Sequence, residues 1–211
     1  MLIQIIKKHK ILEEYQLSDN LPLFLNIDNH KQHYNGHLLK YYNFLKNKIN
    51  TIKELFNSEF LYDIVIKSYG VMEHMSFYNN ASQVLCHIMF WESFTNNNQD
   101  NIIPDSVFQL FCNSFDNIKN QNDIHNLIYD KGIQSFGSSW LFVVLLDDNK
   151  VNIIVTPNAF NPINIENTKE ILVCIDLWEH VFYNEYQHNK GEYLKKCLQY
   201  INWKQCESFI R

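Results

Sequence analysis

The sequence lacks several features that assign a protein to a class at once. Its apolar runs, such as residues 140–146, are far shorter than the ~20 residues that a membrane-spanning helix requires. Its lysines form no cluster longer than residues 7–10, and a net charge of -5 offers no long-range attraction for nucleic acid or an anionic membrane. We therefore expect no nucleic-acid partner and no membrane.

The cysteines exclude two further arrangements. Five are present, an odd number, and none forms a C-x-x-C pair, which argues against a disulfide framework and a cysteine-rich zinc site. A reducing compartment fits this pattern. The first ten residues place apolar residues before lysines, the reverse of a secretory signal, so we expect a cytoplasmic protein, with a mitochondrion or another organelle left open.

Common catalytic motifs are missing as well. The sequence has no glycine-rich phosphate loop, no G-x-S-x-G and no H-E-x-x-H. Any chemistry must therefore come from the nine histidines and their neighbours.

What is present predicts an α+β protein in two parts. An asparagine-rich stretch at residues 96–104 suggests a linker, so we expect an N-terminal antiparallel helical hairpin domain at residues 1–97 and an α/β domain at residues 98–211. The second domain would hold a three-stranded antiparallel sheet surrounded by helices. The expected elements are helices near 28–50, 79–94, 105–118 and 122–135, strands at 139–146, 151–155 and 170–175, and helices from 178 and at 192–203.

Two groups of residues at helical spacing are candidate metal ligands. His33, His37 and Tyr41 follow one another at four-residue steps, so a helix would project all three from one face. Such a histidine pair either binds a metal or forms hydrogen bonds on a half-buried face. Gln83 and His87 are also one helical turn apart, in an apolar stretch where a core histidine held by one hydrogen bond is the alternative.

A third candidate is the sequence DLWEH at residues 176–180. Asp176 ends an apolar strand and His180 follows four residues later, so a carboxylate and an imidazole could converge on one cation. The alternative is an N-cap aspartate followed by a surface histidine. If all three places converge, three imidazoles and one carboxylate suit a redox-active iron or manganese ion, but spacing alone does not show convergence.

Four motifs in a fixed order carry more information than any one of them. They are HYNGHLLKY at residues 33–41, NNASQVLCHIMFW at 79–91, FGSSW at 136–140 and DLWEHVFY at 176–183. Their order, spacing and identities resemble the signature of iron/manganese superoxide dismutases. The resemblance extends from about residue 15 to residue 203.

This resemblance implies a role for each matched residue. The metal ligands would be His33, His87, Asp176 and His180. The residues that gate the site and hydrogen-bond near the metal would be Tyr41, His37, Gln83 and Tyr183, and the aromatic wall would be Trp91, Trp140 and Trp178. In the homodimer that the family implies, Glu179 would reach His180 of the partner subunit, and Tyr186 would meet His37 of the partner subunit.

The resemblance also implies a reaction and a metal. Superoxide anion would be converted to dioxygen and hydrogen peroxide by redox cycling of one iron ion per subunit, which is an antioxidant function. Gln83 occupies the position typical of iron enzymes, whereas Ala159 occupies the manganese-type position, so iron is expected and manganese is the second choice. Lys190 would help to attract the anion to a protein of net negative charge.

Several positions depart from the family pattern. They are Leu38, Phe90, Phe182, Ser139 and Lys190, which replace a histidine, two tyrosines, a glycine and an arginine. We expect Ser139 to strain a tight backbone, and Leu38 with Phe90 to dry the entrance and lower activity. The departures leave open a divergent family member that binds metal without turnover. A zinc hydrolase is a weaker alternative, because it needs a general base and Gln83 cannot serve as one.

Overall fold

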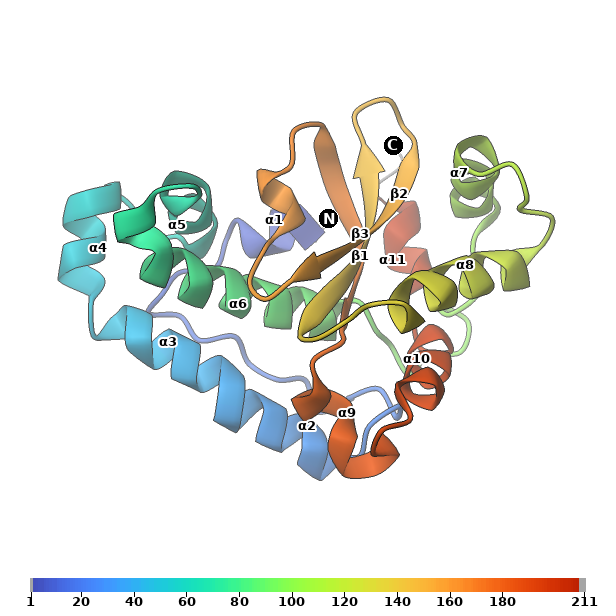
Figure 1. Ribbon diagram of the computed structural model, residues 1–211, viewed down its shortest axis with the longest axis horizontal. Coiled ribbons are helices and arrows are strands. Elements are labelled where there is room, and N and C mark those ends of the chain that lie inside the picture. Colours follow the sequence, from blue (N-terminus) through green and yellow to red (C-terminus); the bar gives the residue numbers. More distant parts are fainter. Residues whose placement is uncertain (1, 209–211) are drawn as a thin grey trace.

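The computed structural model describes residues 2–208, and it shows the α+β protein that the sequence predicts (Figure 1). The elements before the sheet are α1 (Leu2–Ile6), α2 (Ile27–His33), the π-helical segment η1 (Tyr34–Leu38), α3 (Leu39–Lys46), α4 (Ile49–Phe56), α5 (Leu61–Ser68), η2 (Met72–His74), α6 (Met75–Glu92), α7 (Asp105–Ser114) and α8 (Gln121–Ile133). They are followed by β1 (Ser139–Leu146), β2 (Val151–Pro157), η3 (Pro162–Asn164), β3 (Thr168–Asp176), α9 (Glu179–Tyr186), α10 (Lys190–Leu198) and α11 (Trp203–Glu207). The predicted linker lies between α6 and α7, while the division into two domains stays a prediction.

The first predicted long helix is interrupted. In place of one helix at residues 28–50, the chain forms α2, η1 and α3 in succession. The side chain of Asn26 accepts a hydrogen bond from the backbone N–H of Asn29 and so caps the start of α2. Helix α3 packs against α6, whose residues 81–91 are all buried. The helical hairpin is therefore present, with a π-helical turn that the spacing does not predict.

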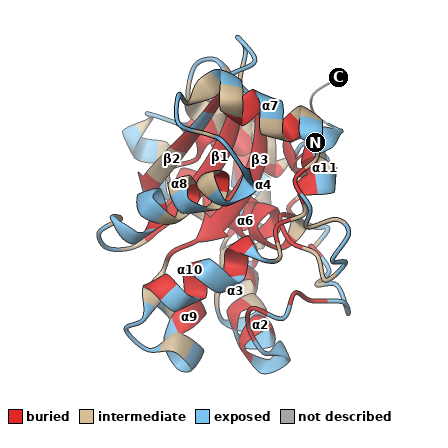
Figure 2. Ribbon diagram, turned by 90° about the vertical axis from the view of Figure 1, so that its right-hand side faces the viewer, coloured by how far each residue is buried: buried red, intermediate tan, exposed pale blue. Residues whose placement is uncertain are grey.

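The three strands form an antiparallel sheet in the order β2-β1-β3. The central strand β1 is buried along almost its whole length, because the sheet lies between α6 and α8 (Figure 2). In the strand register, Trp140 at the start of β1 pairs with Asp176 at the end of β3. This pairing brings an indole and a carboxylate to the same end of the sheet.

Buried hydrogen bonds connect the last strand to the helices around it. The hydroxyl of Ser93, just after α6, accepts a hydrogen bond of 2.8 Å from the backbone N–H of Cys174 in β3. The hydroxyl of Tyr193 on α10 donates a hydrogen bond of 2.9 Å to the backbone carbonyl of Asp176. The end of β3 is therefore held from two sides.

Two expectations about the second half are corrected. The helix predicted at residues 192–203 ends at Leu198, because the side chain of Asn202 accepts a hydrogen bond from the backbone N–H of Gln205 and starts the separate helix α11. Ser139 does not strain the backbone, since it lies in β1 and is not among the described residues with positive φ.

The described residues also bear on the membrane and the cysteines. Between residues 2 and 208, no helix has both the length and the apolar character needed to cross a membrane. All five cysteines are free thiols, and four of them are buried.

Candidate metal centre

Four side chains from four different elements converge beside the end of the sheet. They are His33 from the end of α2, His87 from α6, Asp176 from the end of β3 and His180 from the start of α9, and together they are called the His/Asp cluster. One nitrogen or oxygen atom from each lies within 4.8 Å of the others. Three of the four residues are buried, whereas the side chain of His180 is 20% exposed.

The converging atoms have no hydrogen-bond partner among the described residues. These atoms are the Nε2 atoms of His33, His87 and His180 and the Oδ2 atom of Asp176. The Oδ2 atom lies 3.2 Å from His33 Nε2 and 3.7 Å from His180 Nε2. Buried polar atoms almost always have partners, so four unpaired ones at one point fit a bound cation.

Hydrogen bonds on the far side of two of these groups fix how they face the cluster. His87 Nδ1 lies 2.7 Å from the backbone carbonyl of Gln83, which can only accept, so Nδ1 carries the proton and Nε2 keeps its lone pair. The Oδ1 atom of Asp176 accepts a hydrogen bond of 2.8 Å from the backbone N–H of Trp178. Oδ2 is therefore the oxygen left for the cluster.

The electrostatics of the cluster favour neutral histidines and an anionic carboxylate. Burial holds the pKa of His33 and of His87 well below the ordinary value. Burial also lowers the pKa of His180 to about 3 and raises the pKa of Asp176 to about 6. At neutral pH three imidazole lone pairs and one negative charge surround the same point, which is the donor set that a divalent or trivalent transition metal prefers.

The π-helical turn changes how His37 and Tyr41 relate to His33. His37 lies within η1, and Tyr41 lies beyond it on α3. The ring of His37 stacks on the ring of His180 with 3.7 Å between their centroids, and the centroid of the Tyr41 ring lies 5.6 Å from that of His87. Both residues border the cluster, although the segment is not the regular α-helix that the four-residue spacing predicts.

Gln83 lies one turn before His87 on α6 and is 4% exposed. Its Nε2 atom donates a hydrogen bond of 3.2 Å to the backbone carbonyl of Asn158. The neighbouring Ser82 hydroxyl donates to the backbone carbonyl of Ala159. The segments that carry Gln83 and Ala159 are therefore hydrogen-bonded to each other in the fold.

The three predicted wall tryptophans each contact an imidazole of the cluster. The ring centroids are 5.2 Å apart for Trp91 and His33, 5.1 Å for Trp140 and His87, and 5.5 Å for Trp178 and His180. Aromatic rings therefore surround the cluster on the sides that α6, β1 and the start of α9 provide.

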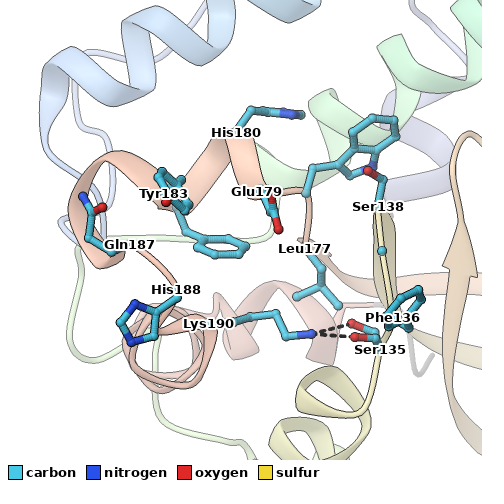
Figure 3. A pocket seen from close by; sticks show the side chains of 13 residues that line it. Ser135, Phe136, Ser138, Leu177, Glu179, His180, Tyr183, Gln187, His188 and Lys190 are labelled. Atoms are coloured by element: carbon cyan, nitrogen blue, oxygen red, sulfur yellow. Dashed lines mark hydrogen bonds between the residues drawn. The ribbon is translucent and has the colours of Figure 1, made fainter.

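The cluster meets the protein surface beside His180. A cavity of about 470 Å³ is lined by His33, His37, His180 and Tyr183, among others. Glu179 and Tyr183 also line a neighbouring cavity of about 640 Å³ (Figure 3). Tyr183 is 51% exposed, and within the described chain no hydrogen bond joins it to His37. Glu179 and Tyr183 therefore lie beside His180, the partly exposed member of the cluster.

Two predicted residues form hydrogen bonds elsewhere in their own chain. The Nζ atom of Lys190 donates to the backbone carbonyl of Ser135 at 2.7 Å and to its hydroxyl at 3.0 Å (Figure 3). Burial lowers the pKa of Lys190. The hydroxyl of Tyr186 donates to the backbone carbonyl of Phe24. The contact expected for Tyr186 across an interface stays a prediction.

Sequence reasoning missed the contribution of His30. This residue is fully buried on α2; its Nε2 atom donates to the backbone carbonyl of Pro22 at 2.9 Å, and its Nδ1 atom accepts from the indole N–H of Trp91 at 3.3 Å. It therefore orients the tryptophan that packs on His33. The available signal was its position three residues before His33, which places both on one side of a helix.

The chain is similar to known proteins over most of its length. The family profile described as iron/manganese superoxide dismutases, C-terminal domain, matches residues 106–209. An iron superoxide dismutase from Pseudoalteromonas translucida is 31% identical over 177 residues, which is 82% of each chain. One from Plasmodium falciparum is 34% identical over 176 residues, 81% of this chain and 80% of that protein. A relative from Rickettsia typhi, named superoxide dismutase [Mn/Fe], is 30% identical over 185 residues, 83% and 78% of the two chains.

Proposed function

Because this chain belongs to the iron/manganese superoxide dismutase family, we propose that it converts superoxide anion to dioxygen and hydrogen peroxide, as an antioxidant enzyme. The proposed site is the His/Asp cluster, whose four residues would be the ligands of one metal ion per subunit. The observation that carries this proposal is the convergence of four unpaired polar atoms at one buried point. A cation would satisfy all four at once.

Iron is the proposed metal, and manganese is the second choice. When bound, either metal would supply the site with a one-electron redox couple. The position of Gln83 favours iron, and so do the names of the relatives from Pseudoalteromonas and Plasmodium, whereas the Rickettsia relative is named for both metals. The hydrogen bond from Gln83 to the carbonyl of Asn158 would restrain the glutamine side chain, which would tune the couple.

The side chains around the cluster would control protons and water. Burial and the charge of Asp176 raise the pKa of the Tyr41 hydroxyl, so this hydroxyl keeps its proton at neutral pH and is available as a donor to an anion. His37, which stacks on His180, would support that gate. The wall tryptophans would exclude bulk water, since they pack on the three imidazoles and leave only His180 partly exposed.

The active form would be a homodimer joined at the face around Glu179. This carboxylate is exposed beside His180, and the ring of Phe136 lining the same cavity is fully exposed. A large apolar side chain left in water beside a functional site favours a contact surface. Glu179 would then orient His180 of the partner subunit, which would make each site depend on its neighbour.

Glu179→Ala tests the proposed bridge. We expect the substitution to weaken both dimerisation and metal retention, because it removes the carboxylate that orients a ligand across the interface. Sedimentation velocity and metal content after dialysis measure the two effects. The control is Glu166→Ala, which removes an exposed carboxylate outside this face. A dimeric Glu179→Ala protein that keeps all of its metal would refute the bridge.

The cytoplasm is the proposed location. The five free thiols suit a reducing compartment, which supports this choice. Cell fractionation followed by detection of the protein would test it, and enrichment in an organelle would contradict it.

Elemental analysis of the purified protein, paired with a superoxide-consumption assay, tests the proposed function. The assay is run before chelation, after chelation, and after reconstitution with iron or with manganese. We expect one iron ion per subunit and activity that chelation removes and iron restores. His87→Ala should lose both metal and activity, whereas His125→Ala, which alters a histidine outside the cluster, should keep them.

Other outcomes of this experiment identify the alternatives. Bound metal without turnover would favour the divergent metal-binding protein. Leu38 and Phe90 do not dry the entrance as expected, since both are fully buried and neither lines the cavity beside His180. Zinc as the only metal would favour the hydrolase.

A further inference from the structure

We propose that Trp91 and Tyr15 form a proton-coupled electron relay that leads from the His/Asp cluster to a separate cavity at the surface. The relay would deliver electrons from a small reductant of the ascorbate or phenol class to an oxidant of the peroxide class at the cluster. This inference rests on the proposed function, since hydrogen peroxide is the product of the proposed reaction.

The relay begins with two ring contacts. The indole of Trp91 lies 5.2 Å from the imidazole of His33, centroid to centroid. The ring of Tyr15 stacks on Trp91 at 6.1 Å with an angle of 12° between the planes. Electron transfer between neighbouring aromatic rings is fast, because the electron tunnels only across a van der Waals gap. The two rings therefore provide a short path away from the metal ligands.

Each ring of the relay has a base hydrogen-bonded to its ionisable hydrogen. The indole N–H of Trp91 donates to His30 Nδ1 at 3.3 Å, and the hydroxyl of Tyr15 donates to Glu92 Oε1 at 2.8 Å. An oxidised indole or phenol is a strong acid, so a base in place makes loss of the electron easier. Burial and the charge of Glu92 raise the pKa of Tyr15, so this hydroxyl gives up its proton only together with an electron.

The other tryptophans near the cluster lack this arrangement. The indole nitrogens of Trp140 and Trp178 are buried and have no hydrogen-bond partner among the described residues. Their rings contact the imidazoles of His87 and His180, but no base would take the indole proton. Oxidation would therefore proceed through Trp91 in preference to either of them.

The outer end of the relay lies at a cavity distinct from the one beside His180. This cavity has a volume of about 280 Å³, and Tyr15, Trp91 and Glu92 line it together with Ser18, Asn20 and Gln205. The cavity beside His180 shares none of these residues. A small polar reductant in the outer cavity would reach the Tyr15 ring without entering the site where superoxide reacts.

The transfer balances in electrons and protons. The peroxide-class oxidant takes one electron from Trp91, whose indole proton moves to His30 Nδ1. Tyr15 then reduces Trp91, which recovers its proton from His30, while the phenolic proton of Tyr15 moves to Glu92. The reductant gives Tyr15 a hydrogen atom and becomes a radical, and Glu92 releases its proton to water. Two such turns supply two electrons. The peroxide takes two protons from solvent, equal in number to those that Glu92 releases, and its O–O bond breaks to give two waters.

Rapid-freeze electron paramagnetic resonance of the iron-loaded protein mixed with hydrogen peroxide tests the relay. We expect a tyrosyl radical in the wild type and loss of that signal in Tyr15→Phe. Glu92→Gln should also lose it, because an amide accepts the hydrogen bond but does not take the proton. Tyr62→Phe is the control that removes a hydroxyl away from the relay. Peptide mass spectrometry after longer exposure should show more oxidation of Trp91 and His33 in Tyr15→Phe than in the wild type.

Superoxide consumption measured on the same preparations separates the two proposals. Normal turnover with a tyrosyl signal that persists in Tyr15→Phe, or with no signal at all, would overturn the relay and leave the proposed function standing. A Tyr15-dependent signal in protein without superoxide turnover would support the relay and count against the proposed function. Absence of any Tyr15-dependent signal overturns the relay whatever the turnover.

Discussion

Removal of one hydroxyl group at Tyr193 is expected to loosen the strand end that carries Asp176. Tyr193 is fully buried on α10, and its hydroxyl donates a hydrogen bond of 2.9 Å to the backbone carbonyl of Asp176. In Tyr193→Phe the ring remains and keeps its stacking on Phe182, whose centroid lies 5.2 Å away. The substitution therefore removes the hydrogen bond with little change in packing.

The loss of unfolding free energy depends on the backbone carbonyl of Asp176, which remains buried without its hydrogen-bond donor. Taking away one partner of a buried hydrogen bond costs about 1–3 kcal/mol of unfolding free energy, because the remaining group is no longer solvated or paired. For a chain of this length each kcal/mol corresponds to a fall in Tm of roughly 2–4 °C. Since the carbonyl belongs to a proposed ligand, we also expect faster loss of metal to a chelator.

Urea unfolding of the metal-loaded protein and the rate of metal release measure the two effects. The control is Tyr200→Phe, because the Tyr200 hydroxyl has no hydrogen-bond partner among residues 2–208. If Tyr193→Phe unfolds at the same urea concentration as the control, then the hydrogen bond does not stabilise the end of β3 and the reasoning fails.

Four further substitutions are expected to have measurable effects. Lys190→Met should slow superoxide consumption at low ionic strength and match the wild type at high salt, since screening removes long-range attraction; a deficit independent of salt would contradict this. Burial lowers the pKa of His125 in the folded protein, so this histidine binds a proton more readily in the unfolded chain. The free energy of unfolding should therefore fall as pH drops below about 6.5. His125→Asn should flatten this pH dependence when it is measured by urea unfolding. Gly36→Ala should raise the unfolding free energy by about 0.4–1 kcal/mol, because its Cβ would meet nothing within 4 Å. Gly132→Ala should lower it by about 1–3 kcal/mol, because its Cβ would lie 3.0 Å from a methyl carbon of Leu194; equal effects of the two substitutions in calorimetry would refute the packing argument.

The parts of the fold that the sequence predicts are those with a long, regular pattern. Helix α6 and the strands β1 and β3 follow from extended apolar stretches; β1 has the predicted bounds, and the bounds of α6 and β3 differ from the predicted ones by a few residues. Helices α4 and α5 have eight residues each, which is too few turns for a clear periodicity. The π-helical turn could not be predicted from the sequence. One extra residue in a helix leaves no pattern that distinguishes it from the ordinary polar residues of the helix surface.

The candidate ligands were predicted from the order of the motifs, since spacing alone left each histidine with a structural alternative. Convergence depends on how α2, α6, β3 and α9 pack, and no local pattern encodes that packing. The hydrogen bonds from Trp91 to His30 and from Tyr193 to Asp176 join residues that are 61 and 17 positions apart. Such partners are found only when the chain is folded, which is why the residues that orient the cluster were missed.

The π-helical turn at Tyr34–Leu38 amounts to one extra residue in a helix that otherwise continues from α2 into α3. Deleting a single residue there would restore a continuous α-helix and rotate everything beyond it by about 100° around the axis. The helix would still form, but Tyr41 would turn away from His87, and the buried side chains of Tyr42 and Leu45 would turn away from the core. A change of one residue in the length of this turn would therefore alter the position of Tyr41 and the packing of α3 on α6 together, so the π-helical turn links the gate residue to the core.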